Sequence, residues 1–471
     1  MTSSTDQGLI KALSTRDVFM AGVGLVVASS TLVSDFEGWI GIGTAFAMAL
    51  VMAFVINLLL GLSAAELAVT YPKAGALYDY GAAAFGGKGA KAAITGIFLG
   101  FSFYAMFGFV GALETNAGAF GLRALFVSDD LSIMEESLLP WIIGMTILAI
   151  IPNLLGIQIL ARVELLVVVV MLAIRWIFGL FGYFGAGNTG GWSASNWDAG
   201  LSMWDWFGSE GVIAAGLIIA IWSFIGIEFV GPLAEETKDP GRMIPKGIVW
   251  GLVAILATSL FMGFGVLGTD PTGAWQSGLE ASGCAGNCTQ LFVGREFWGD
   301  GGRLLMAVAS VLATFASMTI VYAGMPRILY GISRNGHFFG PLSRVFSYLH
   351  PRYRTPWTAI IATAVVYVIV GNYASSVVDL IFAGAYVWLI LYVVYHLLVI
   401  ISRMNDPDVD RPFRLPLIVP IIGALATIYG IYQAFAGAHE IFLPMAIWIL
   451  AGSLVAAVIS YALKGSARMG G

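Results

Sequence analysis

Long apolar runs recur from one end of the chain to the other, with only short polar segments between them. A transmembrane helix needs about 20 apolar residues to cross a bilayer, so this pattern predicts an all-α membrane protein with about 12 transmembrane helices. The predicted spans are residues 17–37, 40–69, 89–119, 139–157, 159–184, 210–233, 243–267, 302–334, 356–371, 375–402, 415–436 and 440–463. Residues 1–14 are polar, and no signal-peptide cleavage pattern follows the first apolar run, so we interpret that run as a span and residues 1–15 as a cytoplasmic N-terminal segment.

Composition supports the same class. Of 471 residues, 59% are hydrophobic and 11% are charged, whereas soluble domains carry about 25% charged residues. Too few charges are present to cover a water-facing surface of this size, so we expect the lipid bilayer to surround the chain. The net charge of -5 gives no indication of nucleic-acid binding.

Lysine and arginine residues are unevenly distributed between the two sides of the predicted spans. With the N-terminus inside, 19 fall in inner segments, 3 fall in outer segments, and Arg175 lies within a span. Positive residues are concentrated on the cytoplasmic side of membrane proteins. We therefore expect a multi-pass protein of the plasma (inner) membrane with both termini in the cytoplasm.

Two predicted spans are interrupted by small and polar residues. The first span contains the interruption at 28–31, and the sixth contains one at 223–226. The two lie five spans apart, so they enter the bilayer from opposite sides. Broken helices at matching positions of two inverted halves indicate a transporter binding site, although small residues also permit close helix packing.

Several short strings, taken together and in order, are similar to those of the amino acid–polyamine–organocation transporter superfamily. They are Tyr71-Pro72-Lys73-Ala74-Gly75-Ala76-Leu77-Tyr78, Asn153-Leu154-Leu155-Gly156, Trp222-Ser223-Phe224-Ile225-Gly226-Ile227-Glu228, Ala234-Glu235-Glu236-Thr237-Lys238-Asp239-Pro240 with Ile244-Pro245, and Arg411-Pro412-Phe413-Arg414-Leu415-Pro416. The sixth-helix string most resembles that of the arginine/agmatine antiporter, and the chain also resembles the amine and polyamine permeases.

The resemblance implies a LeuT-type fold, a 5+5 inverted repeat in which helices 1 and 6 are discontinuous. The first repeat would cover 16–184, the second 210–402 and two further helices 415–463, with a cytoplasmic tail at 464–471. Two departures matter. The family's first break reads Gly-Ser-Gly, and the aligned residues here are Ala28, Ser29 and Ser30, which crowd the amides that would hold a substrate carboxylate. A fifth-helix lysine of many relatives aligns with Met171 here.

The expected site combines the two breaks, an aromatic cage and buried carboxylates. An aromatic ring and a carboxylate together attract ammonium groups, and carboxylates within spans are functional by default. The expected substrate-binding residues are Ala28, Ser29, Ser30, Thr31, Tyr104, Phe107, Trp222, Ser223, Phe224, Ile225 and Gly226. The expected coupling residues are Glu228, Glu114 and Asp35, with Glu37 and Asp379 as further acidic positions near span ends.

The function that these features favour is secondary active transport of an amino acid, amine or polyamine, preferably a cationic amine, by alternating access. A proton is the first choice of coupling ion. The alternative is a sodium-coupled symporter or an exchanger of zwitterionic amino acids, in which Ser317 and Thr319 would supply hydroxyls to the ion. A channel would need repeated filter loops, and an enzyme would need a clustered catalytic set that the four scattered histidines do not form. A homodimer is left open.

The two cysteines, Cys284 and Cys288, lie in a polar segment predicted to face outward. Two thiols without a neighbouring histidine do not suit a structural zinc site, so we expect no metal and no cofactor. A disulfide and two free thiols both remain open at this stage.

Overall fold

The computed structural model describes residues 9, 11–127, 137–185, 191–198, 201–207, 211–270, 273–373, 377–434 and 439–464. These residues are almost entirely helical, and within them the only β-pairing is an isolated parallel bridge between Leu13 and Thr237. The elements are α1 (Thr15–Val26), α2 (Ser29–Ile42), α3 (Ala45–Thr70), α4 (Leu77–Ala84), α5 (Gly89–Phe126), α6 (Leu139–Leu155), α7 (Ile157–Tyr183), η2 (Ala194–Asp198), α8 (Val212–Trp222), η3 (Ile227–Glu236), α9 (Pro240–Leu267), α10 (Ala274–Ala281), α11 (Thr289–Arg334), α12 (Leu342–Phe346), α13 (Trp357–Asn372), α14 (Val377–Asn405), α15 (Ile418–Ala434) and α16 (His439–Ala462).

Each predicted span overlaps a helix or a broken helix pair. By length and composition, 8 helices of the described residues are able to cross a membrane, or 9 when the bent pair α1 and α2 is taken as one span. Three shorter apolar helices, α6, α13 and α15, coincide with the remaining predicted spans. The structure therefore agrees with an all-α membrane protein of this superfamily's type.

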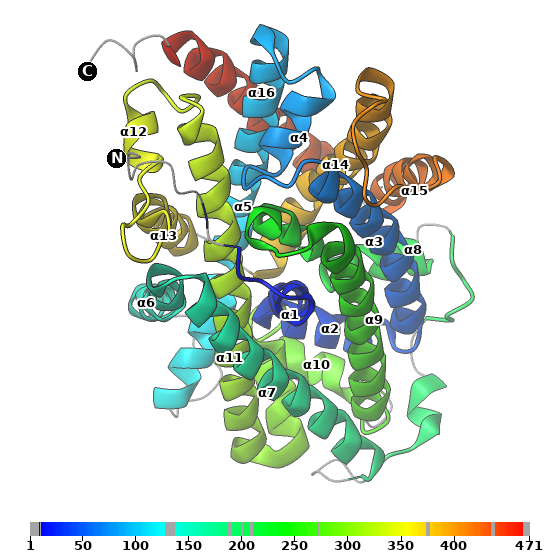
Figure 1. The fold of residues 1–471 in the computed structure, drawn as a ribbon. Helices are drawn as coiled ribbons and strands as arrows, with labels where there is room; N and C mark the ends of the chain where they lie inside the picture. The colour runs from blue at the N-terminus through cyan, green and yellow to red at the C-terminus, as the bar shows by residue number, and fades with distance from the viewer. Residues whose placement is uncertain are drawn as a thin grey trace.

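The broken pair α1 and α2 occupies the centre of the bundle, with α3, α5, α7, α9 and α11 around it (Figure 1). Most of α2 is buried, including its polar residues Ser29, Ser30 and Asp35. By contrast, α15 and α16 lie at the periphery and expose large apolar side chains such as Leu425 and Trp448. Polar residues inside and apolar residues outside are the arrangement expected where lipid replaces water around the bundle.

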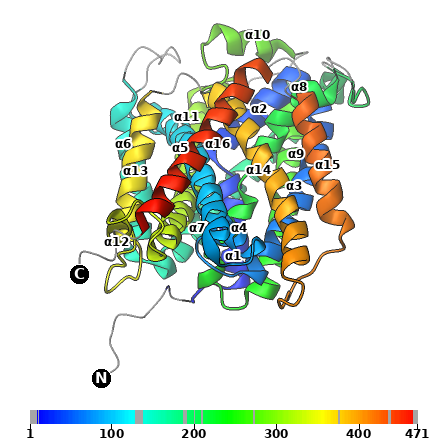
Figure 2. The same cartoon turned by 90° about the horizontal axis from the view of Figure 1, so that it is seen from above.

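The connecting segments gather at two opposite ends of the bundle. In Figure 2, α4 and α12 lie at one end, and α10 lies at the other end. At the first end, Glu235 and Glu236 follow the broken sixth helix and pair with α11: Glu236 lies 2.5 Å from Arg327, and Glu235 lies 2.9 Å from Arg334. Two of the strings shared with the superfamily thus join the two halves of the chain, because Glu235 also accepts the amide of Ala74 at 2.8 Å.

Candidate functional site

The first break separates α1 from α2. The two helices meet at an angle of 57° across Val27 and Ala28. The hydroxyl of Thr31 donates to the carbonyl of Val26 at 2.6 Å, which satisfies one acceptor released at the end of α1. Ala28 is the N-cap of α2 and has no side chain that caps it, so the first amides of α2 are open to another acceptor.

The second break follows α8, which ends at Trp222 and is continued by a turn and then by the 3₁₀ helix η3. Gly226 has φ of 110°, a conformation that glycine adopts without strain. A Cβ at Gly226 would lie 2.7 Å from Cδ2 of Leu25 on α1. A glycine is therefore required both for the turn and for the close approach of the two breaks.

A small cavity of about 20 Å³ lies between the two breaks. Its lining residues are Leu25, Ala28, Thr31, Phe107, Val110, Glu114, Trp222, Ile225, Gly226 and Trp388. A volume of this size holds about one water molecule. The cavity is therefore too small for an organic molecule in this conformation.

Aromatic side chains line the cavity, but they are only partly the ones that the sequence predicted. Trp222 and Phe107 line the cavity, and Trp388 of α14 joins them. Tyr104 instead bonds Thr363 of α13 at 2.7 Å, and Phe224 packs edge-on against Phe54 at 6.1 Å between ring centroids. Tyr104 and Phe224 are not among the lining residues, because Tyr104 on α5 contacts α13 and Phe224 in the turn after α8 contacts α3.

Glu114 lies at the amino end of α2. Its carboxylate accepts a hydrogen bond from the hydroxyl of Ser30, and the backbone amides of Ser29 and Ser30 also interact with it. Trp222 donates from Nε1 to the same Ser30 hydroxyl at 2.8 Å. The carboxylate of Glu114 thus occupies the anion-binding position that a helix N-terminus offers, and it links the first break to the second.

Asp35 is contacted by side chains from two helices and from the second break. Its carboxylate lies 3.2 Å from Arg175 of α7, and it accepts the hydroxyls of Ser223 at 2.7 Å and Ser259 at 3.0 Å. Both charged side chains are fully buried. The ion pair joins α2 to α7, and the hydroxyls of Ser223 and Ser259 connect Asp35 to the second half of the chain, so Asp35 is a structural connection as well as an expected coupling residue.

Glu228 lies in the first turn of η3 and is buried beside the cavity. It accepts a hydrogen bond from Nε1 of Trp388 at 2.5 Å and from the amide of Gly226 at 3.2 Å. Neither donor carries a charge. The geometry therefore places an acidic group behind the aromatic wall of the cavity, where movement of Trp388 would change its surroundings.

Comparisons with known proteins decide the family. A sequence profile of the amino acid permease family matches residues 13–459, which is nearly the whole chain. The chain belongs to the amino acid permease family, within the amino acid–polyamine–organocation superfamily. As such it is a multi-pass membrane transporter for small amino-acid-like molecules and not an enzyme.

Two relatives match this permease over almost their full length. The branched-chain amino acid permease BcaP of Bacillus subtilis is 24% identical over 481 residues, covering 96% of this chain and 94% of the relative. The methylthioribose transporter of the same organism is 22% identical over 480 residues, with the same coverage. The serine/threonine exchanger SteT, also of Bacillus subtilis, is 23% identical over 220 residues, covering 46% of this chain and 47% of the exchanger.

Glu164 is a buried acidic residue of this permease that the sequence interpretation missed. It lies on α7 and accepts the hydroxyl of Thr319 at 2.6 Å, while its Oε1 has no hydrogen-bond partner among the described residues. A Cβ at Gly24 of α1 would overlap this oxygen. Met171 is the α7 residue that corresponds to the lysine of many relatives, but Glu164 and Val168 are the α7 side chains that meet α1 at Gly24, near the break. A carboxylate inside the predicted span 159–184, directly before a long apolar run, was the available signal.

The segment with the two cysteines packs against the carboxyl-terminal half of α2. Cys284 and Cys288 form a disulfide, which the sequence left open. Glu37 accepts the amide of Gly286 at 2.6 Å and also the hydroxyl of Thr289. Glu37 therefore holds this segment rather than the central site. Asp379 lies in α14, and its side chain is outside the described part of the chain.

Among the described residues, no group of three or more His, Cys, Asp or Glu is placed to hold a metal ion. The acidic residues near the breaks lie on four different helices, α2, α5, α7 and η3, and do not form one cluster. Each of them has its own set of donors, as given above for Asp35, Glu114, Glu164 and Glu228.

Proposed function

We propose that this chain is a secondary active transporter that works by alternating access around the two breaks. The proposal assigns α1 to α7 to a first inverted repeat, residues 16–184, and α8 to α14 to a second, residues 210–402. The helices at 415–463 would then stand outside the repeats. It is supported by the central position of both breaks and by the closed cavity between them.

The substrate class that the site favours is an organic ammonium ion, as in a cationic amine or polyamine or the amino group of an amino acid. The observation that carries this proposal is the position of Glu114. Its carboxylate already occupies the amino end of α2, where a substrate carboxylate would otherwise bind. A substrate ammonium group would meet Glu114 and the ring faces of Trp222 and Phe107, which attract cations.

Competition for uptake tests this preference. Purified protein in liposomes should take up a labelled amino acid, and the amine that lacks its carboxylate should compete at least as strongly as the parent. The reason is that removal of the carboxylate removes repulsion from Glu114 and leaves the ammonium contact. Competition by the zwitterionic parents alone would contradict the proposal.

A second candidate is sodium-coupled symport or exchange of zwitterionic amino acids. It is favoured by the cavity lining, which is apolar at Leu25, Val110 and Ile225 and thus suits an aliphatic side chain. The full-length relative whose name specifies branched-chain amino acids points the same way. The hydroxyl of Thr319 faces Glu164, and a sodium ion would use oxygen ligands of this kind. Dependence of uptake on sodium distinguishes this candidate from the first.

A proton is the coupling ion that we favour, and Glu228, Glu114 and Asp35 are its proposed carriers, joined now by Glu164. Asp35 is the weakest candidate for a proton carrier, because its carboxylate is paired with the charged side chain of Arg175. Glu228 is the strongest candidate for a proton carrier, because its two hydrogen-bond donors, Trp388 and Gly226, are neutral. A carboxylate with neutral donors changes charge state more readily than one in an ion pair.

Replacing Glu228 by glutamine should therefore flatten the pH dependence of transport and leave binding intact. Glutamine keeps the shape and still accepts the Trp388 bond, but it is fixed in the neutral form. Uptake would be measured against pH for both proteins in the same liposome preparation. Superimposable pH profiles of the two proteins would remove Glu228 from the coupling mechanism. Asp35→Asn is not a suitable control, because it also breaks the ion pair with Arg175.

We further propose that the end of the bundle with α4 and α12 faces the cytoplasm and that the end with α10 faces outward. The uneven distribution of lysine and arginine supports this orientation. Two matched variants test it, Ser277→Cys in α10 and Ser347→Cys after α12. In intact cells an impermeant thiol reagent should label the first and reach the second only after permeabilisation. The reverse pattern would overturn the orientation.

A further inference from the structure

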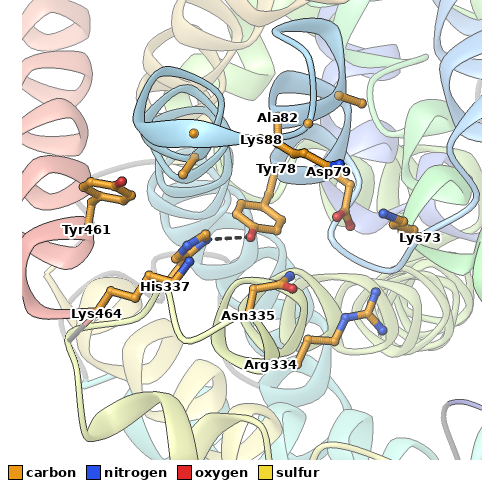
Figure 3. Close-up of a pocket in the computed structure, with 14 residues that line it drawn as sticks. Lys73, Tyr78, Asp79, Ala82, Lys88, Arg334, Asn335, His337, Tyr461 and Lys464 are labelled. Carbon is orange, nitrogen blue, oxygen red and sulfur yellow. Dashed lines mark hydrogen bonds between the residues drawn. The ribbon is translucent and has the colours of Figure 1, made fainter. Parts of the chain in front are cut away.

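A second and larger cavity lies away from the two breaks, at the end of the bundle that carries α4. It is bounded by α4, the start of α5, the end of α11 and the end of α16 (Figure 3). Its volume of about 450 Å³ is within the usual range of about 300–1,000 Å³ for ligand sites. Its lining residues are Lys73, Tyr78, Asp79, Ala82, Ala83, Gly87, Lys88, Gly89, Ala93, Arg334, Asn335, His337, Tyr461 and Lys464.

Positive charge predominates around this cavity. Arg334 is committed to Glu235, with both guanidinium contacts at 2.9 and 3.0 Å. Lys73, Lys88 and Lys464 reach the cavity from three separate segments, and none of them forms an ion pair with a described residue. The one carboxylate of the lining, Asp79, is partly satisfied because it accepts the amide of Gly75 at 3.0 Å. The charge of Lys73 also acts on Asp79, which leaves Lys88 and Lys464 as the positive charges that indicate an anionic ligand.

The backbone at the start of α5 adds donors to the same wall. Gly87 and Gly89 both have positive φ, at 68° and 83°, so the turn here depends on glycine. Lys88 is the N-cap of α5 and provides no side-chain cap, which leaves the first amides of this 38-residue helix available. A glycine-rich turn that leads into a helix N-terminus is a backbone arrangement that binds phosphate.

His337 supplies an independent indication of a missing partner. It is 6% exposed and lines the cavity. Its Nδ1 lies 2.8 Å from the hydroxyl of Tyr78, while its Nε2 has no hydrogen-bond partner among the described residues. Burial, together with the charge of Lys464, lowers the pKa of His337 to about 4, so the ring is neutral near pH 7. A buried ring nitrogen without a partner is costly, and a ligand oxygen in the cavity would satisfy it.

We propose that this cavity binds a phosphate group, which either an anionic phospholipid headgroup or a small phosphorylated solute presents. Lys88 and Lys464 would hold its charge, the amides that begin α5 would hold its oxygens, and His337 would donate from Nε2. The bound group would connect α4 and α5 to α11 and α16, which come from distant parts of the sequence. Binding should therefore stabilise the folded protein.

The first arm of the test uses free anions. Delipidated protein in detergent would be titrated with inorganic pyrophosphate, with sodium chloride at matched ionic strength as the salt control, and thermal unfolding would be followed. Pyrophosphate should raise the unfolding midpoint of the wild type. In the double variant Lys88→Gln/Lys464→Gln the affinity should fall by roughly 25-fold, since each lysine near an anionic group contributes a factor of about five. Lys91→Gln is the matched control, because Lys91 lies on the same helix outside the lining.

The second arm uses lipid. The same proteins would be placed in phosphatidylcholine nanodiscs with or without phosphatidylglycerol, and their unfolding midpoints would be compared. Stabilisation by phosphatidylglycerol that the double variant loses and Lys91→Gln keeps, without a response to pyrophosphate, identifies a lipid headgroup as the ligand. A response to pyrophosphate in the first arm shows that a free phosphorylated solute is sufficient for binding to this cavity.

Asp79→Asn is a variant that should strengthen anion binding, whereas the lysine variants should weaken it. It removes the negative charge that opposes an anion and keeps an oxygen for the Gly75 amide, so it should strengthen the response in whichever arm is positive. No response of the wild type in either arm would overturn the proposal. Equal responses of the wild type and the double variant would overturn it as well. Transport measurements do not enter these outcomes, so failure here is separate from failure of the proposed transport function.

Discussion

Replacing Asp35 by alanine should destabilise the protein far more than replacing Asp35 and Arg175 together. Both side chains are buried and lie 3.2 Å apart. Removal of one partner leaves an uncompensated buried charge, which costs about 3–5 kcal/mol, whereas replacement of a buried pair by apolar residues is often neutral. The uncompensated group would be Arg175, whose Nε and Nη2 already have no partner among the described residues.

The comparison needs four proteins. Asp35→Ala and the double variant Asp35→Ala/Arg175→Met are compared with wild type by unfolding in detergent, and Ser259→Ala serves as the control. Ser259→Ala removes a single hydroxyl contact of 3.0 Å to Asp35, which is worth about 1 kcal/mol. We expect the double variant to recover most of the stability that Asp35→Ala loses. Equal loss in the single and double variants would show that the ion pair is not what connects these helices.

Replacing Glu114 by glutamine should weaken binding of an ammonium substrate by roughly 30-fold or more. Removal of one member of a buried charge pair costs about 2–5 kcal/mol, and each 1.4 kcal/mol is tenfold in affinity. Glutamine retains an oxygen that accepts the Ser30 hydroxyl, so the link between the breaks is largely preserved. Binding of the amine would be measured by competition in liposomes and by thermal shift.

The same variant separates the two substrate classes. If the amino end of α2 is an anion site that Glu114 blocks, Glu114→Gln should maintain or improve the affinity for zwitterionic amino acids while it lowers the affinity for amines. Ser317→Ala is a suitable control, because Ser317 makes only a 3.5 Å contact to Glu114. Unchanged amine affinity in Glu114→Gln would exclude a direct contact between Glu114 and the substrate ammonium.

The apolar pattern predicted the helices well because each span must satisfy its backbone within itself. The start of α5 at Gly89 and the start of α6 at Leu139 coincide with the predicted positions. The helix break after Trp222 was also visible, because Ser223 and Gly226 interrupt an apolar run and the turn depends on Gly226. These are local properties of the chain, so the sequence contains them without reference to distant segments.

The composition of the site was only partly visible in the sequence. Trp222 and Glu114 were identified from their position near a break or within a span, and both line the cavity. Tyr104 and Phe224 were not distinguished from them, since the direction of a side chain within a bundle depends on the neighbouring helices. Trp388 was missed for the same reason, because α14 is far from the breaks in sequence.

By itself, then, the sequence determined the class of protein, the order of its helices and the two places where they break, because hydrophobic length and helix-breaking residues act locally. The tertiary structure alone decided which partner each buried charge has. Asp35 is matched with Arg175, 140 residues away, and Glu114 with the hydroxyl of Ser30 at the start of α2, 84 residues away. Such pairings arise from the way the helices pack, and the electrostatic environment of a carboxylate is set by neighbours that no local pattern specifies.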